Sequence, residues 1–422
     1  MHKLNANAYS AVLKGGLRPT TLIGGTLSRF FISMATLGFL AMYAQEGYSY
    51  TLAGIGIGCV QLSNCIISPR VSRLIDTYGQ SKVVPPATLV GIGALASVLL
   101  IVHFHGPIIA AFAVSVFIGF IPQAQSLTRA RWSYLFKSTG TYDATRLRTA
   151  FSFEGILDDI AFMFSPALAI ALSSWLFPEA GLVLGGIAYV IGITLVLIDK
   201  KSEPDVTFMN RRAQKSNLQD DTLSLHERKR SVLIEYPVVA VFFVSMLMFG
   251  LLFGFLDPST YGFCGEVATE EVASLAFMVS SVFSVVTGFV FGMLYVKSPP
   301  VRQAMIVGLV VAVLYVPFLL VGDIPTLFLA HIAGAFSYAP FVITVNSIVE
   351  RSVPSSRVTE SLTWMGSGIQ LGLAFGPGLA GLVIDAYSVQ AAFAGVSLSA
   401  ALIPVLFVVT LPILRKGLPS GA

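Results

Sequence analysis

Residues 199–235 read DKKSEPDVTFMNRRAQKSNLQDDTLSLHERKRSVLIE, the longest polar stretch of this 422-residue chain. A sliding hydropathy window of about 19 residues finds six apolar segments before it and six after it. Each is long enough to cross a bilayer core of roughly 30 Å as a helix. The sequence therefore predicts an all-α integral membrane protein with twelve transmembrane helices, near residues 20–43, 51–69, 83–103, 107–127, 150–175, 181–198, 236–256, 272–296, 302–321, 326–349, 359–384 and 391–413.

The charges between these segments predict the side of the membrane on which each loop lies. Lys and Arg fall in alternate gaps, and Arg29 is the one cation drawn into a predicted helix. The other gaps hold only acids, at Glu46, Glu179, Asp257, Glu266, Glu270, Glu271, Asp323 and Asp385. Because loops rich in Lys and Arg stay in the cytoplasm, we expect both termini there, in a multi-pass protein of the plasma (inner) membrane.

Composition excludes several other classes of protein. Hydrophobic residues make up 55% of the chain and charged residues 11%, and the mean hydropathy is +0.80, unlike a soluble globular domain. The net charge of +4 is expected to reflect orientation in the bilayer and not nucleic-acid binding. The sequence shows no metal-ligand spacing, phosphate-binding loop or catalytic constellation, so it predicts neither an enzyme nor a cofactor.

The two sets of six segments carry traces of an internal repeat. An offset of 211 residues places Arg146 on Arg357 and Pro166 on Pro377. Six-helix repeats around a central cavity are the geometry of alternating-access transporters, which bind substrate near the membrane midplane. The predicted organisation is an N-terminal six-helix bundle (1–198), a cytoplasmic linker (199–235) and a C-terminal six-helix bundle (236–422).

The loop after the second apolar segment carries a motif. Residues 69–82 read PRVSRLIDTYGQSK, in which Asp76 and Gly79 match the loop signature Gly-x-x-x-Asp-Arg-x-Gly-Arg-Arg of the major facilitator superfamily. The chain resembles this superfamily over essentially its whole length, which implies two six-helix pseudo-repeats. The resemblance also implies a gating loop at Arg73, Asp76 and Gly79, where a carboxylate can pair with a helix end and glycine permits a tight turn. The sequence departs from the signature at Ser72, Thr77, Gln80 and Ser81.

A second motif lies in the eleventh segment. Residues 372–381 read GLAFGPGLAG, similar to the Gly-Pro motif that marks exporters of the superfamily in their fifth span. Small residues let helices approach closely and proline bends a span, so we assign helix packing to Pro166, Gly372, Gly376 and Pro377. A further combination looks like a group of actinobacterial exporter-like permeases of the superfamily: Arg29 with Met34, residues 129–132, which read RARW, residues 154–166 and residues 346–364. This resemblance implies efflux by alternating access.

The fifth segment holds the residues best suited to ion coupling. A charge at mid-membrane costs roughly 2.5–3.5 kcal/mol on insertion scales, so acids there should be paired or protonated. Glu154 and Asp158 share a helix face, and Asp159 lies about 100° further round. We expect Asp158, with Glu154 as second choice, to exchange a proton and to compete for Arg29. The alternative is that these acids form fixed structural pairs with Arg29 and the basic residues of 129–148.

The resemblance implies a substrate cavity lined by the first, fourth, seventh and tenth spans. Aromatic and Met side chains there would offer an adaptable apolar surface, suited to amphipathic organic molecules more than to a sugar. Ordinary helix packing is the alternative for each of them singly. The candidates are Met34, Tyr43, Phe117, Phe120, Gln123, Met246, Phe249, Phe253, His331, Phe336, Tyr338 and Asn346.

The sequence leaves three functions to compare. The first is proton-coupled efflux, by antiport, of amphipathic small molecules. The second is proton-coupled uptake of a metabolite such as a sugar or organic ion, which needs polar cavity groups that the chain offers mainly at Arg29, Gln123 and Asn346. A non-transporting scaffold or sensor would predict a further soluble domain, which the sequence does not show. The expected partners are a small-molecule substrate, protons and the lipid bilayer, and the expected state is a monomer.

Overall fold

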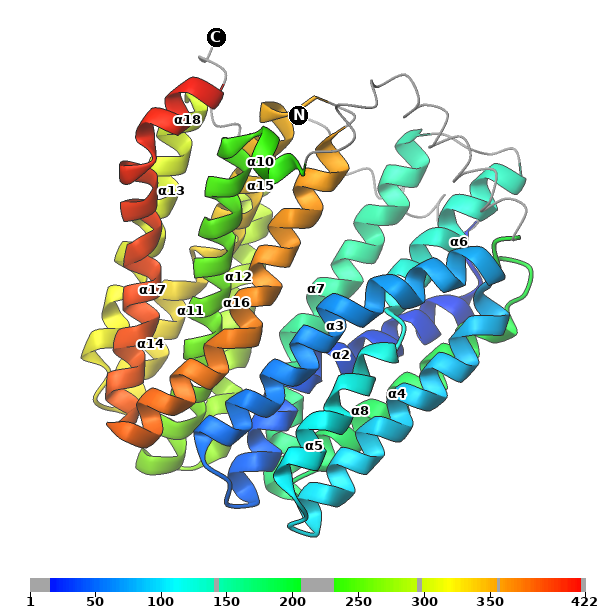
Figure 1. The fold of residues 1–422 in the computed structure, drawn as a ribbon, viewed down its shortest axis with the longest axis horizontal. Helices are drawn as coiled ribbons and strands as arrows, with labels where there is room; N and C mark the ends of the chain where they lie inside the picture. Colours follow the sequence, from blue (N-terminus) through cyan, green and yellow to red (C-terminus); the bar gives the residue numbers. More distant parts are fainter. Residues whose placement is uncertain (1–15, 140–143, 206–230, 294–297, 355–356, 419–422) are drawn as a thin grey trace. The chain divides into compact units, whose positions relative to one another are not determined.

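The computed structural model describes residues 16–139, 144–205, 231–293, 298–354 and 357–418, and these ranges form helices and no strands (Figure 1). The predicted all-α fold is confirmed. The helices of the first half are α2 (Pro19–Gln45), α3 (Tyr50–Tyr78), α4 (Gln80–His103), α5 (Ile108–Ser115), η1 (Val116–Phe120), α6 (Ala124–Ser138), α7 (Ala144–Trp175) and α8 (Ala180–Ile198). Those of the second half are α10 (Val232–Glu235), α11 (Pro237–Val267), α12 (Glu270–Met293), α13 (Pro300–Leu314), η3 (Val316–Leu320), α14 (Ile324–Ala335), α15 (Tyr338–Ser352), α16 (Val358–Ala386), α17 (Val389–Val409) and α18 (Leu411–Gly417).

Eleven helical segments of the described chain are long and apolar enough to cross a membrane. The one predicted span that is not among these eleven, residues 150–175, corresponds to α7, a helix of 32 residues. Among the described residues, Phe164–Trp175 of α7 is a shorter apolar helix, and the first half of α7 carries the acids predicted to couple ions. The predicted count of twelve is therefore approximately supported.

Helix α3 is longer than its apolar segment and corrects the predicted gating loop. It continues to Tyr78, so Arg73 and Asp76 lie in a helix and not in a loop. Charged side chains at a helix end can reach the membrane surface, which lets the helix extend beyond the bilayer core. Gly79 alone separates α3 from α4, with a φ of 94° that suits glycine and few other residues.

Helix α11 is also longer than predicted. It ends at Val267, so Asp257, which the charge pattern placed in an outer gap, lies inside the helix. The stretch 257–262, DPSTYG, has the composition of a turn, which is why the hydropathy window ended before it. Tertiary packing outweighs the tendency of this stretch to form a turn, since every residue from Pro258 to Cys264 is buried.

The chain forms two compact units. Unit 1 comprises residues 1–38 and 66–219, and unit 2 comprises residues 39–65 and 220–422. Helices α2 and α3 each contribute one part to each unit. The predicted boundaries at 198 and 236 stay a prediction.

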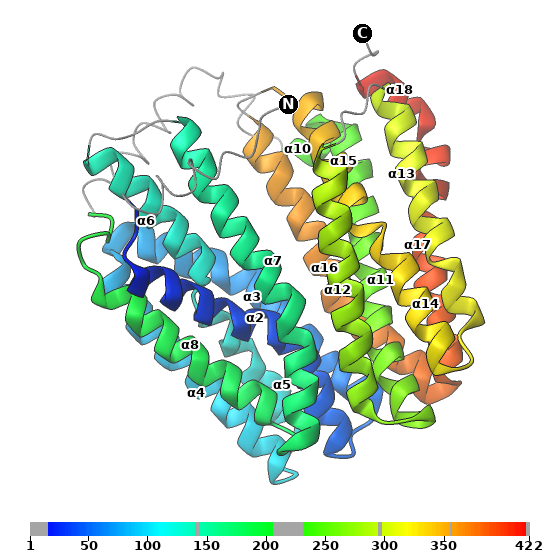
Figure 2. The ribbon, with the colours of Figure 1, turned by 180° about the vertical axis from the view of Figure 1, so that it is seen from behind.

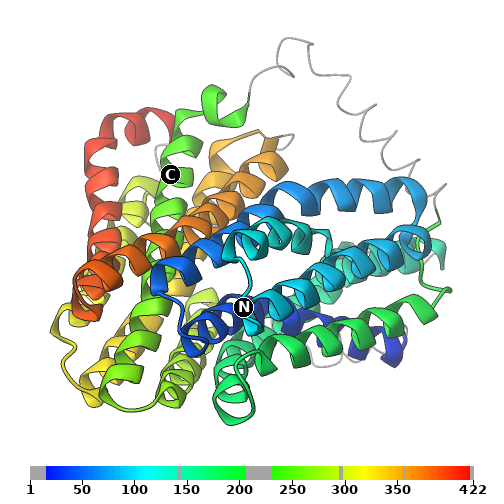
Figure 3. The same cartoon turned by 60° about the horizontal axis from the view of Figure 1, so that its bottom comes forward.

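Within unit 1, glycine lets α2 pack closely on α8, and the two helices run side by side (Figure 3). A methyl group at Gly24 would lie 2.5 Å from the carbonyl oxygen of Gly192, and one at Gly192 would lie 2.5 Å from that of Gly24. The break between η1 and α6 is held by the Tyr189 hydroxyl of α8, which donates to the Pro122 carbonyl at 2.7 Å.

Within unit 2, α11 packs along α16 and α17 (Figure 2). The predicted packing residues Gly372 and Gly376 lie at this contact, where an added methyl group would come within 2.4 Å and 2.6 Å of the α11 backbone. The first turns of α3 also pack on α16, since a methyl group at Gly54 would lie 2.2 Å from the Pro377 carbonyl oxygen. Pro166 lies inside α7 of unit 1.

Candidate functional site

Arg29 of α2 is the centre of a buried ionic cluster in unit 1, where α2 meets α6 and α7. Its side chain is 5% exposed. Nη2 donates to the Glu154 carboxylate and, at 3.1 Å, to the Thr128 hydroxyl, while Nε lies 2.6 Å from Asp158 Oδ1. One guanidinium therefore contacts both acids that the sequence singled out on α7.

Glu154 is fully enclosed and has three donors. Besides Arg29, the Thr128 hydroxyl donates to Oε2 at 2.7 Å and Trp132 Nε1 donates to Oε1 at 2.8 Å. Both Glu154 and Trp132 are 0% exposed. Three donors fix the position of this carboxylate, so Glu154 suits the role of a fixed anchor.

Asp158 lies at the more open edge of the cluster. Its side chain is 12% exposed and accepts hydrogen bonds from the Gln125 amide and, at 3.3 Å, from Arg129 Nη2. The Arg129 side chain is 40% exposed. Asp158 can thus be reached by water while it remains paired with Arg29.

The local sequence explains this arrangement. Glu154 and Asp158 lie one helical turn apart on α7. The donors on α6 follow the same spacing of three or four residues, and they are Gln125, Thr128, Arg129 and Trp132. A methyl group at Gly25 would come within 2.7 Å of Thr128 Cγ2, so glycine permits the close approach of α2 to α6. The side chain of Asp159, the third predicted acid, lies outside the described part of the chain.

The charges of this cluster leave one acid without a buried cation of its own. Two carboxylates face one buried guanidinium, and the second cation, Arg129, is partly exposed. Burial of ions is unfavourable unless each is paired and hydrogen-bonded.

Sequence reasoning missed a second buried arginine in unit 1. Arg131 of α6 is 0% exposed and was expected only among the cytoplasmic cations. Its Nε donates to Gln80 Oε1 at 2.8 Å, and its Nη1 donates to the Asp199 carbonyl at 2.6 Å and to the Ser202 hydroxyl at 2.9 Å. Gln80 stands where the family signature has a basic residue. This departure was the one sequence feature that could have pointed to a buried partner for Gln80.

Asp199 connects this arginine to the start of α2. Its carboxylate accepts from Thr21 at 2.8 Å and from Ser202 at 2.9 Å, and lies 3.7 Å from Arg18. Burial alone would raise the pKa of Asp199, but the two hydrogen bonds together with Arg18 and Arg131 outweigh it and hold the pKa below its usual range. This second cluster is a structural connection between α2, α4, α6 and the end of α8.

The predicted cavity residues divide between the two units. In unit 1, the Phe117 and Phe120 rings stack at 6.2 Å, with Phe117 50% exposed. Met34 is buried, with Sδ 3.3 Å from the place a methyl group would take at Gly185. Gln123 lies between η1 and α6. In unit 2 lie Tyr43, Met246, Phe249, Phe253, His331, Phe336, Tyr338 and Asn346.

The structure brings three of the unit 2 candidates together in an aromatic cluster. The Phe249 ring lies 5.2 Å from that of Phe253 and 5.8 Å from that of Tyr338, and Phe253 and Tyr338 are 5.6 Å apart. Phe341 extends the cluster, 4.5 Å from Phe249. Tyr338 is 41% exposed, so the cluster is open on one side.

His331 and Tyr43 are packed within unit 2. His331 Nε2 lies 2.9 Å from the Thr260 hydroxyl, and the ring is enclosed by Phe277 and Phe318 at 5.5 and 5.3 Å. The Tyr43 ring is 0% exposed and lies against Gly56 of α3. Met246 is also buried, and Asn346 is partly exposed on α15.

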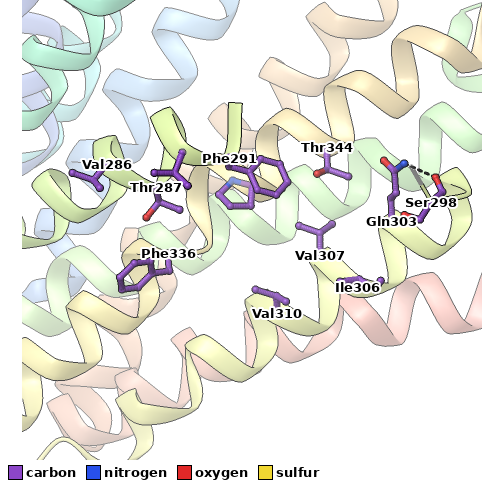
Figure 4. A pocket seen from close by; sticks show the side chains of 12 residues that line it. Val286, Thr287, Phe291, Ser298, Gln303, Ile306, Val307, Val310, Phe336 and Thr344 are labelled. Carbon is purple, nitrogen blue, oxygen red and sulfur yellow. Dashed lines mark hydrogen bonds between the residues drawn. The ribbon is translucent and has the colours of Figure 1, made fainter. Parts of the chain in front are cut away.

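A cavity of about 490 Å³ lies within unit 2, between α12, α13 and the end of α14 with α15 (Figure 4). Of the predicted cavity residues, Phe336 lines it. Most other lining side chains are apolar, and at one end Gln303 Nε2 donates to the Ser298 carbonyl at 2.5 Å. The cavity is lined by Val286, Thr287, Val290, Phe291, Ser298, Gln303, Ile306, Val307, Val310, Phe336, Pro340 and Thr344.

Comparison with known proteins supports the resemblance stated from the sequence. Residues 259–421 match the family model of the Major Facilitator Superfamily. The recognition of this superfamily is thereby confirmed over the C-terminal part of the chain. No curated protein matches the chain by sequence.

Solved transporter structures share the fold over nearly the whole chain. The nucleoside transporter NupG aligns with a TM-score of 0.71 at 16% identity, covering 94% of this chain and 100% of its own. An auto inhibited POT family peptide transporter aligns with a TM-score of 0.66 at 12% identity, covering 94% and 96%. A POT family transporter solved with a thioalcohol conjugated peptide gives 0.61 at 13%, covering 93% and 95%. At these identities the likeness establishes the fold.

Proposed function

We propose that this chain is a secondary active transporter that exports amphipathic small organic molecules in exchange for protons. Its family match and its structural neighbours are those of transporters. In this proposal the bundles of residues 1–198 and 236–422 alternate in their exposure of a substrate site, in the plasma membrane, with both termini in the cytoplasm. No enzymatic step is part of the proposal.

The observation that carries the proton coupling is the buried cluster of Arg29, Glu154 and Asp158. Glu154 has three donors and is the fixed anchor for Arg29. Asp158 has the more accessible carboxylate and shares Arg29 with Glu154. When Asp158 takes a proton, Arg29 remains paired with Glu154, so the cluster has two stable states that differ by one proton.

The aromatic residues support the substrate class. The open cluster around Phe249 and the stacked pair of Phe117 and Phe120 present apolar surface with few directional bonds. Such a surface suits amphipathic molecules of varied shape more than a sugar, which needs many fixed hydrogen bonds.

Substitution of Asp158 by Asn tests the coupling. In everted membrane vesicles with an acidified interior, a pH-sensitive dye should report alkalinisation when a transported compound from a broad panel is added. Asp158→Asn should abolish this response, because an amide cannot exchange the proton. Glu350→Gln, an exposed acid on α15, should retain it. Alkalinisation by Asp158→Asn at the rate of the unchanged protein would show that the proton role is wrong.

The same vesicles decide the direction of transport. Under exchange, an acidic interior should drive the compound into everted vesicles. Under proton-coupled uptake, the acidic interior should instead drive the compound out of them, and right-side-out vesicles in acidic medium should accumulate it. The second result would replace efflux by uptake and leave the role of Asp158 in place.

A further inference from the structure

Asp257 is an acid within a transmembrane helix that the proposed proton coupling does not use. It lies on α11, ten residues before the helix ends at Val267. An ionisable residue inside a span is unfavourable in lipid and is kept where it faces protein or a water-filled space and has a function. Among the described residues it forms no hydrogen bond or ion pair, and its carboxylate interacts electrostatically with the Tyr315 phenol.

The surroundings of Asp257 are protein and not lipid. Leu256 and every residue from Pro258 to Cys264 are buried, whereas Asp257 itself is partly exposed. Thr260, one turn later on α11, is bonded to His331 of α14, and Tyr261 donates to Glu270 of α12. Asp257 therefore lies on a helix that neighbouring helices of unit 2 cover, and is itself partly exposed.

The same face of α11 carries the aromatic cluster one turn earlier. Phe253 precedes Asp257 by four residues, so the two side chains are neighbours along the helix. Phe253 packs edge-on against Tyr338 with ring planes at 81°, and Tyr338 is 41% exposed. The partly exposed Asp257 thus adjoins an aromatic cluster that is open at Tyr338, both within unit 2.

We propose that Asp257 together with Phe253 and Tyr338 binds the positive charge of an amphipathic organic cation. This inference rests on the proposed function and names the class of substrate. The carboxylate supplies the counter-charge, and the faces of aromatic rings attract cations through their quadrupole. The titratable groups that interact with Asp257 directly or through a shared neighbour are Tyr315 and Tyr338, and neither carries a positive charge that would compete with the ligand.

The negative charge of the site excludes the opposite class of ligand. An organic anion of the same size would meet the Asp257 carboxylate and, one turn further, the Glu270 carboxylate that Tyr261 and Gln45 bind. The ring quadrupoles also favour the cation, so the part of the preference that Asp257→Asn removes measures the contribution of the carboxylate.

Equilibrium binding of two ions of matched shape tests this inference. The purified full chain in detergent, at one pH and without a gradient, is titrated with tetraphenylphosphonium and with tetraphenylborate. We expect the cation to bind at least about tenfold more tightly than the anion. Asp257→Asn should weaken binding of the cation by about tenfold and reduce the preference accordingly, and Asp257→Glu should retain it. Glu266→Gln, an exposed acid on the same helix, should leave it unchanged.

The outcomes separate this inference from the proposed function. Equal affinity for the two ions in the unchanged protein, or an Asp257→Asn variant that keeps the preference, would overturn the cation site. The Asp257→Asn variant could fail to fold, which its elution from a size-exclusion column would show. In that case Phe253→Leu is the test, since it should weaken binding of the cation and leave the fold intact. Asp158→Asn should keep the preference, because binding without a gradient needs no proton exchange. Loss of proton-driven transport alone would therefore leave the cation site standing.

Discussion

At the scale of single residues, Trp132 shows how a buried acid is held in place. Its Nε1 donates to Glu154, and both side chains are fully buried. Trp132→Phe keeps most of the ring but leaves Glu154 with one donor fewer, which should cost about 1–3 kcal/mol. We expect a lower midpoint of thermal unfolding in detergent. Trp175→Phe, at a position 70% exposed on α7, is the matched control and should unfold as the unchanged protein does.

Asp199 gives a prediction for the pH dependence of stability. Because its pKa is lower in the folded protein than in the unfolded chain, it stabilises the fold at neutral pH. That contribution is complete above the unfolded pKa of about 4 and is lost as the pH falls through the folded pKa. Asp199→Asn should therefore lower the unfolding midpoint at pH 7, and the difference should shrink at acidic pH. A difference that is constant across this range would contradict the assignment.

The central ionic residues could be chosen from the sequence, but their partners could not. Arg29, Glu154 and Asp158 stand out because charges are rare in apolar segments. Gln125, Thr128 and Trp132 are neutral, and nothing in their composition marks them as donors. Their role depends on which face of α6 turns toward α7, and hydropathy does not determine that rotation. Asp257 was missed for the opposite reason, because its polar neighbours resemble a turn.

At the scale of elements, Gly79 fixes the junction of α3 and α4. Its φ of 94° and ψ of 155° are accessible to glycine and costly for other residues. Gly79→Ala should destabilise the protein by about 1–3 kcal/mol and lower the unfolding midpoint. Gly93→Ala, within α4 and with open space around it, is the matched control and should be neutral or slightly stabilising. Equal midpoints for the two variants would refute the argument.

The ends of elements were harder to predict than their existence. Hydropathy located the spans because about 20 apolar residues are needed to cross a bilayer. It ended α3 and α11 too early, since helical hydrogen bonding continues wherever packing or the membrane surface satisfies the polar side chains. The error matters for function, as it placed Arg73, Asp76 and Asp257 in loops and the structure places them in helices.

At the scale of the whole molecule, the sequence predicted the class of fold from physical constraints alone. The apolar segments required an all-helical membrane protein, and the family match and the solved transporters agree with that class. The grouping of the helices was less accessible, because the turn after α2 and the start of α3 cluster with unit 2. Close packing of glycines such as Gly54 on α16 explains this grouping, and a charge count along the chain contains no such information.

Transport by the purified chain tests the central claim most directly. The chain is reconstituted alone into liposomes, a pH gradient is imposed, and accumulation of a compound found in the vesicle panel is measured with and without a protonophore. We predict accumulation that follows the gradient, disappears with the protonophore and is absent for Asp158→Asn. Gradient-driven accumulation that Asp158→Asn leaves unchanged would contradict the account.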